Sequence, residues 1–150
     1  MFRHVIFSAA LALGLTGAAA AQDAFECEWQ ARADAIVEPW EENSRTFANG
    51  DVRLALLDTI EPAAGALHIL VLSPPLDEFG GRQCRTVSMA EGIGFSGADF
   101  STLTARYEPS VGLIFQMNVR RFLPDQDIFG DALLTFTLNQ ATGHIGAGLK

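Results

Sequence analysis

The chain has 150 residues, 49% of them hydrophobic, and its formal net charge at pH 7 is −8. A chain of this length provides one domain and can bury a sizeable hydrophobic core. Nucleic-acid binding depends on cationic side chains that neutralise phosphates, so we do not expect so acidic a chain to bind DNA or RNA. The acidic balance instead indicates solubility and a preference for basic partners.

Residues 1–21 have the organisation of a secretory signal peptide. A basic start precedes an apolar run over residues 5–15, and a tract of small residues follows the run. The run is about a dozen residues long, which is too short for the roughly 20 residues that span a bilayer. Ala19 and Ala21 fit the A-x-A rule for cleavage before Gln22. We therefore predict a periplasmic or secreted protein.

The mature single β-rich domain is expected to span residues 22–150. It holds nine Lys and Arg residues against eighteen Asp and Glu residues, a formal charge of about −9. Its two cysteines are Cys27 and Cys84, and an even number of cysteines in a small exported domain predicts a disulfide. The alternative is two separate buried thiols. Cys27 follows Phe25 and Glu26, which do not suit a lipoprotein attachment site, so we expect export without an anchor.

The pattern is least clear over residues 26–37. Alanines in this segment are compatible with a short helix, which Pro39 would end. The alternation of Ala33, Ala35 and Val37 with polar neighbours is equally compatible with an extended arm. The short N-terminal helix is the preferred interpretation, and the extended arm is the alternative.

Turn signals separate the apolar runs in the rest of the chain. The pair Asn49-Gly50 is the strongest two-residue signal for a hairpin. Three polar stretches also lie between alternating apolar runs, and connections of three to five residues with a glycine are typical of β-hairpins. The closing glycine of each stretch is expected to adopt a positive φ angle. The stretches are residues 61–65, 108–112 and 139–143.

The apolar runs between these turns predict antiparallel strands. Residues 52–60 and 66–73 should form the first long hairpin, and the second of these runs should be a central strand because it is apolar on both faces. The later hairpins alternate cleanly between apolar and polar residues, which indicates one buried and one solvated face. We therefore predict an all-β, single-domain antiparallel meander of roughly seven to nine strands that closes as a small barrel or a sandwich.

Residues 92–97 spell G-x-G-x-x-G, the pattern of dinucleotide-binding sites. That pattern binds a dinucleotide where a strand leads directly into the glycines and a helix follows them. The segment after these glycines alternates like a strand. We therefore interpret residues 92–97 as a glycine-rich bend or bulge, and we expect no cofactor.

Acidic residues near position 130 resemble the start of a calcium-binding loop. Asp125, Asp127 and Asp131 are candidate metal ligands of an irregular site. Phe129 and Phe136 stand where two further ligands would be needed, so an exposed acidic loop between strands is the preferred interpretation.

The candidate acid-base residues are His68 and Asp58. If Ile60 pairs with Ala66 in the first hairpin, Asp58 lies opposite His68 and would make the imidazole more basic. The hairpin is apolar on both faces, so the pattern leaves its register open by one residue. A structural pair is the preferred interpretation, because no Ser-His-Asp or Cys-His arrangement presents itself in the sequence.

Three functions remain open for such a domain. The preferred one is a non-catalytic binding or interaction module of the cell envelope that contacts an envelope protein or a small ligand. Loops such as residues 73–82, with Leu76 and Phe79, could provide apolar contacts. The alternatives are a hydrolase that uses His68 and Asp58, and a small outer-membrane β-barrel. The barrel requires strands that are apolar only on their outer face, and we therefore expect a protein that does not span a membrane.

Overall fold

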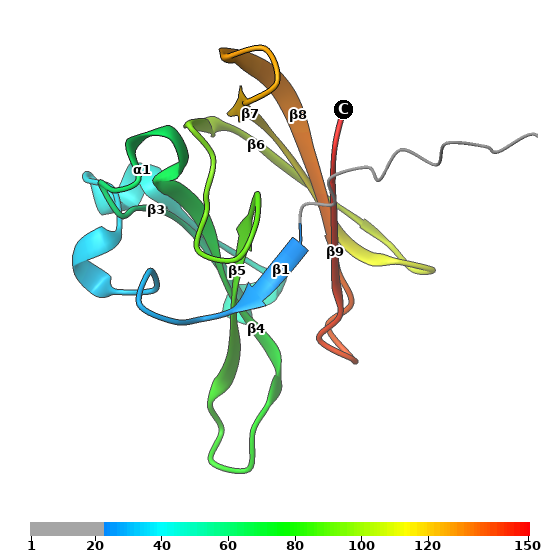
Figure 1. The fold of residues 1–150 in the computed structure, drawn as a ribbon. Helices are drawn as coiled ribbons and strands as arrows, with labels where there is room; N and C mark the ends of the chain where they lie inside the picture. Colours follow the sequence, from blue (N-terminus) through cyan, green and yellow to red (C-terminus); the bar gives the residue numbers. More distant parts are fainter. Residues whose placement is uncertain (1–22) are drawn as a thin grey trace, which may run out of the picture.

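A computed structural model describes residues 23–150, which form nine strands in two antiparallel sheets (Figure 1). The expected signal peptide and its cleavage site before Gln22 lie outside the described residues. The first sheet contains β1 (Asp23–Glu26), β2 (Ser44–Phe47), β3 (Val52–Asp58), β4 (Leu67–Leu76) and β5 (Arg82–Ser88), in the order β1, β5, β4, β3, β2. The second contains β6 (Gly97–Glu108), β7 (Gly112–Leu123), β8 (Ile128–Leu138) and β9 (Ile145–Leu149), in chain order.

The two sheets face each other across the main hydrophobic core. Leu54 and Val71 contribute to the core from the first sheet, and Phe115 and Phe136 contribute from the second. The rings of Phe115 and Phe136 stack with centroids 4.9 Å apart, and Phe47 meets Phe115 edge-on at 5.0 Å. Side chains from both inner faces therefore interdigitate as in a β-sandwich. The predicted all-β class is confirmed, and of the two predicted architectures the structure has the sandwich.

The outer face of the first sheet is covered by the N-terminal arm, residues 27–39 (Figure 1). Ala35 of the arm packs against Leu57 and Leu70 of the sheet. The backbone N–H of Val37 donates to the carbonyl of Leu56 at 3.0 Å, which fixes the arm along β3. The predicted double coverage of the central strand is thus confirmed, with the second sheet on one face of β4 and the arm on the other.

The preferred helix over residues 26–37 was wrong. Only a 3-10 turn, η1 (Ala33–Ala35), forms there, and Pro39 precedes the four-residue helix α1 (Trp40–Asn43) instead of ending one. An isolated helix shorter than about 12 residues is marginal in water. Packing of the arm against the sheet outweighs the high helix propensity of its alanines. Among the described residues, no helix is both long and apolar enough to cross a membrane.

The predicted disulfide is present. It joins Cys27 at the start of the N-terminal arm to Cys84 in β5, with 5.4 Å between their Cα atoms. This separation lies within the usual range for a disulfide. The bond fixes the arm to the first sheet at the end opposite the Val37 contact.

The predicted turns are present, with one correction. Gly112 and Gly143 have φ angles of +110° and +76°, as expected, but Gly65 does not have a positive φ. Gly65 closes a 3-10 turn, η3 (Ala63–Gly65), and the left-handed position in this connection is occupied by Ile60 at φ +69°. Gly65 is constrained by space instead, because a Cβ there would lie 3.0 Å from Cγ2 of Ile93.

The register proposed for the β3–β4 hairpin was also wrong. Asp58 pairs with Leu67, so Leu57 and not Asp58 lies opposite His68. The last contact before the connection is made by the N–H of Thr59, which donates to the carbonyl of Ala66. A slip of one residue turns every side chain of a strand to the other face of the sheet. A strand that is apolar on both faces does not favour one register over the other.

Candidate functional site

The described residues contain three features of functional interest: the buried pair His68 and Ser88, a groove on the second sheet, and a projecting hairpin. His68 lies on the outer face of the first sheet, fully buried. Its Nδ1 lies 2.7 Å from Oγ of Ser88 in β5. Its Nε2 has no hydrogen-bond partner in the described part of the chain, and the same holds for the buried Thr86 Oγ1 and Gln30 Oε1.

Burial lowers the pKa of His68, and the negative charge of Asp58 opposes this shift only in part. Asp58 does not orient the imidazole. Its Oδ1 accepts the backbone N–H of Ile60 at 2.7 Å and thereby organises the β3–β4 connection. The two predicted acid-base residues are therefore not brought together as a catalytic pair.

Sequence reasoning missed the pairing of His68 with Ser88. A hydroxyl within hydrogen-bond distance of an imidazole is part of the arrangement that activates a serine nucleophile, but the base normally has a third group that orients it. His68 and Ser88 are both fully buried. A substrate therefore cannot reach this pair in the observed arrangement. Only the β4–β5 register reveals the contact, because the two residues are twenty positions apart.

The candidate metal ligands do not form a site with one another. Asp125 and Asp127 lie in the turn between β7 and β8, whereas Asp131 lies in β8. Oδ1 of Asp131 faces Nε of Arg120 at 3.8 Å, and its side chain is almost wholly exposed. Within residues 23–150, no three His, Cys, Asp or Glu side chains are gathered closely enough to hold a metal ion.

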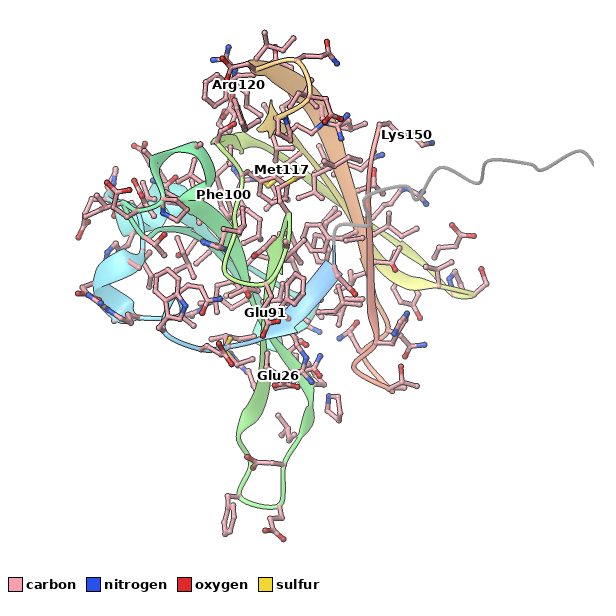
Figure 2. All side chains as sticks on the ribbon, in the orientation of Figure 1. Glu26, Glu91, Phe100, Met117, Arg120 and Lys150 are labelled. Carbon is pink, nitrogen blue, oxygen red and sulfur yellow. A yellow bond between two sulfur atoms is a disulfide. The ribbon has the colours of Figure 1, made fainter. Side chains whose placement is uncertain are left out.

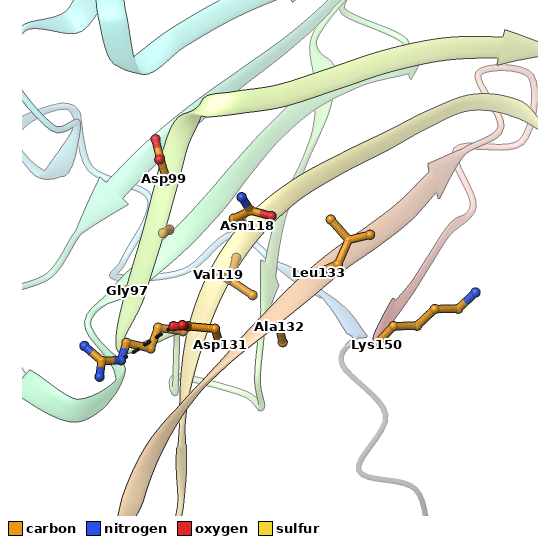
Figure 3. A pocket seen from close by; sticks show the side chains of 10 residues that line it. Gly97, Asp99, Asn118, Val119, Asp131, Ala132, Leu133 and Lys150 are labelled. Carbon is orange, nitrogen blue, oxygen red and sulfur yellow. Dashed lines mark ion pairs between the residues drawn. The ribbon is translucent and has the colours of Figure 1, made fainter.

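A shallow groove of about 690 Å³ crosses one end of the second sheet (Figure 3). Asp99, Asn118 and Leu133 lie side by side on neighbouring strands in its middle. Lys150 lies at one side of the groove (Figure 3), and Arg120 also lines it, paired with Asp131 at 3.8 Å. Charges of both signs are thus distributed around the groove and do not converge on one point. Sequence reasoning did not find it, because its residues come from both the expected solvated face, such as Asn118, and the expected buried face, such as Val119.

The third feature is the protruding hairpin, residues 73–82, which connects β4 to β5 and extends away from the rest of the molecule (Figures 1 and 2). Phe79 near its tip is 89% exposed, and Leu76 is 58% exposed. These are two of the residues that the sequence suggested for apolar contacts. The hairpin thus displays apolar side chains at the end of a projection.

Hydrogen bonds give the tip of the protruding hairpin a defined conformation. Oδ1 of Asp77 accepts the backbone N–H groups of Phe79 at 2.9 Å and Gly81 at 2.7 Å. The backbone N–H of Asp77 donates to the carbonyl of Gly81 at 2.8 Å, and that of Gly80 donates back to Asp77 at 3.0 Å. The Asp77 side chain therefore accepts hydrogen bonds from backbone N–H groups of the turn that would otherwise bond to water.

The base of the protruding hairpin is attached to two other turns. Nη2 of Arg82 donates to the carbonyl of Gly50 at 2.8 Å, in the β2–β3 connection. Nε2 of Gln83 donates to Ser73 Oγ at 2.9 Å and to the carbonyl of Gly143 at 2.8 Å, in the β8–β9 connection. These bonds fix the direction of the projection relative to both sheets.

Comparison with known proteins assigns no family to this fold or to these features. No protein-family model matches the chain, and no curated protein or solved structure gives a significant match.

Proposed function

We propose that this chain is a non-catalytic binding or interaction module of the cell envelope, periplasmic or secreted, whose protruding hairpin contacts a partner protein. The observation that carries the proposal is Phe79, a large aromatic side chain that is 89% exposed at the tip of a hydrogen-bonded projection. Single exposed hydrophobic residues are common on protein surfaces. Here Leu76 adds a second exposed apolar side chain on the same hairpin, at the end of β4.

Order in the protruding hairpin favours binding. Association costs conformational entropy when loops and side chains become fixed at an interface. The bonds from Asp77 and Gln83 fix this segment before any partner arrives. Exposed aromatic side chains that enter a partner's pocket commonly contribute much of the binding free energy. A rigid hairpin with Phe79 at its tip can therefore bind through a small interface, because little conformational entropy is lost on association.

The charge near the tip indicates the chemistry of the partner. The carboxylate of Asp77 is engaged in the turn, and Glu78 lies beside it on the same tip. The whole chain carries a formal charge of −8. Complementary charge steers association and disfavours partners of like charge. We infer a partner with an apolar pocket flanked by basic side chains.

Two further observations support this proposal, one concerning the oxidising compartment and one favouring binding over catalysis. The Cys27–Cys84 disulfide is of a kind that persists in exported proteins. The candidate catalytic histidine, His68, is fully buried and hydrogen-bonded to Ser88. A hydrolase that used His68 would first have to expose this side chain to its substrate.

Site-specific photocrosslinking tests this proposal. A benzophenone amino acid replaces Phe79, and in a matched control it replaces Tyr107, an aromatic side chain that is 65% exposed at the end of another hairpin. We expect one adduct of defined mass from position 79 in envelope extracts and none from position 107. Excess unlabelled protein should abolish the adduct, whereas excess Phe79→Ala protein should not. Equal adducts from the two positions, or full competition by Phe79→Ala, would rule out the hairpin as the contact.

A further inference from the structure

An apolar pocket lies at the opposite end of the β4–β5 strand pair from the protruding hairpin. Its volume is about 320 Å³, and three separate segments form it: the β3–β4 connection, the loop after β5, and the β7–β8 hairpin. We call it the apolar end pocket. Its lining includes Pro62, Ala64, Gly65, Ile93, Gly94 and Phe122.

The glycine-rich stretch over residues 92–97 forms one wall of this pocket. Gly92 turns the chain with a φ of +70°, and Gly94 passes so close to β4 that a Cβ there would lie 2.2 Å from the carbonyl oxygen of Leu67. Ile93 stands between these glycines at the pocket, 46% exposed. The glycines thus place an isoleucine over the pocket, a role unrelated to phosphate binding.

The walls of the apolar end pocket are held in place by bonds that do not need a ligand. The N–H of Gly94 donates to the carbonyl of Gly65 at 2.7 Å, which joins two of the three segments. Leu67 and Phe95 exchange backbone hydrogen bonds at 3.0 and 2.6 Å. On the third segment, the ring of Phe122 packs against Phe129 with centroids 5.2 Å apart. The pocket is therefore largely preformed, as ligand sites usually are.

The lining defines what the apolar end pocket can accept. None of its side chains carries a charge or a hydrogen-bonding hydroxyl, amide or ring nitrogen. The nearby backbone groups are engaged, since the N–H of Gly65 donates to Pro62 at 2.8 Å and the N–H of Ile93 donates to Ala90 at 3.0 Å. A cation would find no counter-ion here, and the chain's charge of −8 disfavours an anion.

We propose that the apolar end pocket binds a small, uncharged apolar molecule. Transfer of an apolar ligand from water to such a lining is favourable by roughly 25 cal/mol per Å² of buried apolar surface. The volume lies at the lower end of the range of about 300–1,000 Å³ that is usual for small-molecule sites. The ligand therefore has the size of a compact ring system or a short aliphatic chain. This site is independent of the protruding hairpin.

Fluorescence titration with N-phenyl-1-naphthylamine, an uncharged aromatic probe, tests the site on the purified protein. We expect saturable binding of one probe per chain. The substitution Ala64→Trp fills the pocket, because Ala64 lines it, and should weaken probe binding by at least about tenfold. The matched control Ala105→Trp adds the same side chain at an exposed position in β6 and should leave binding unchanged.

Two results would overturn the proposal: no saturable binding by the unsubstituted protein, or equal binding by the Ala64→Trp variant. If Ala64→Trp does not fold, amide chemical shifts of the unsubstituted protein decide the question. The probe should then shift the signals of Gly65 and Gly94, and shifts elsewhere alone would place it at another site. Phe79→Ala should bind the probe normally, which separates this test from that of the protruding hairpin.

Discussion

At the scale of single residues, the buried imidazole of His68 links the stability of the fold to pH. Burial lowers its pKa below the ordinary value of 6.5, which the unfolded chain retains. Above that pH the imidazole is neutral in both the folded and the unfolded state, so its protonation does not lower the free energy of unfolding. Below it the unfolded state binds a proton before the folded state does, and the free energy of unfolding falls as pH falls.

We therefore predict a loss of stability as the pH falls below about 6.5 that depends on His68. Denaturant unfolding of the unsubstituted protein over this range should show it, and the His68→Gln variant should lack this component of the slope. His144 is exposed near the β8–β9 turn, so His144→Gln is the matched control and should retain the component. The same pH dependence in His68→Gln as in the unsubstituted protein would contradict this assignment.

A second residue-scale prediction concerns Ile60. It is β-branched, has a φ of +69° and is 76% exposed, so its side chain contributes little packing to offset an unfavourable backbone conformation. Ile60→Gly should raise the free energy of unfolding by about 1 kcal/mol, because the relief of strain exceeds the entropy that glycine loses on folding. Thermal unfolding measures the change. Ile60→Val keeps the β-branch and should leave stability unchanged, and a similar gain in both variants would argue against strain.

At the scale of elements, the glycine in the β6–β7 turn makes a close contact that local sequence does not reveal. Gly112 has a φ of +110°, and a Cβ there would lie 2.3 Å from the carbonyl oxygen of Leu138 in β8. Gly50 in the β2–β3 connection has a φ of +94°, but a Cβ there would have no neighbour within 4 Å. A side chain at Gly50 would therefore cost only backbone strain, whereas a side chain at Gly112 would cost both backbone strain and a steric clash.

We predict that Gly50→Ala costs about 1 kcal/mol of stability, because only the positive φ is unfavourable. Gly112→Ala should cost about 3 kcal/mol or more, because the β6–β7 turn must also move away from β8. Chemical denaturation of both variants measures the difference. Equal losses would mean that the turn moves away from Leu138 without cost.

The success of sequence reasoning at this scale depended on how local each signal was. Residues at the turns predicted the hairpins, because a turn is determined by a few neighbouring residues. The β3–β4 register was not predictable, since apolar residues on both faces of the hairpin favour no face. The N-terminal arm was assigned to a helix because its stabilising contacts, such as that of Ala35 with Leu57, are made with distant strands.

The candidate sites were harder to predict than the fold for the same reason. Phe79 was identified because its loop lies between two clear strands. The apolar end pocket was not, because Pro62, Ile93 and Phe122 come from three segments that meet only in the folded chain. Likewise, the contact of His68 with Ser88 follows from strand pairing and leaves no local pattern.

At the scale of the whole molecule, the sandwich has a third layer held in place by a disulfide. The N-terminal arm covers Leu57 and Leu70 on the outer face of the first sheet. The Cys27–Cys84 bond closes a loop of 57 positions. In the chain-entropy account, such a loop restricts the unfolded state and stabilises the fold by up to about 4 kcal/mol.

We predict that reduction of this bond lowers the melting temperature by several degrees and loosens the arm before the sandwich unfolds. Hydrogen exchange should then accelerate first at Val37, whose N–H bonds to Leu56 at the far end of the arm. Exchange at Phe115, whose side chain lies between the two sheets, should change only with global stability, because no fully buried residue of the main core belongs to the arm and only the partly buried Val37 packs against it from there. Reduction without any change at Val37 would show that packing alone holds the arm. Simultaneous acceleration at Val37 and Phe115 would instead show that arm and sandwich unfold as one cooperative unit.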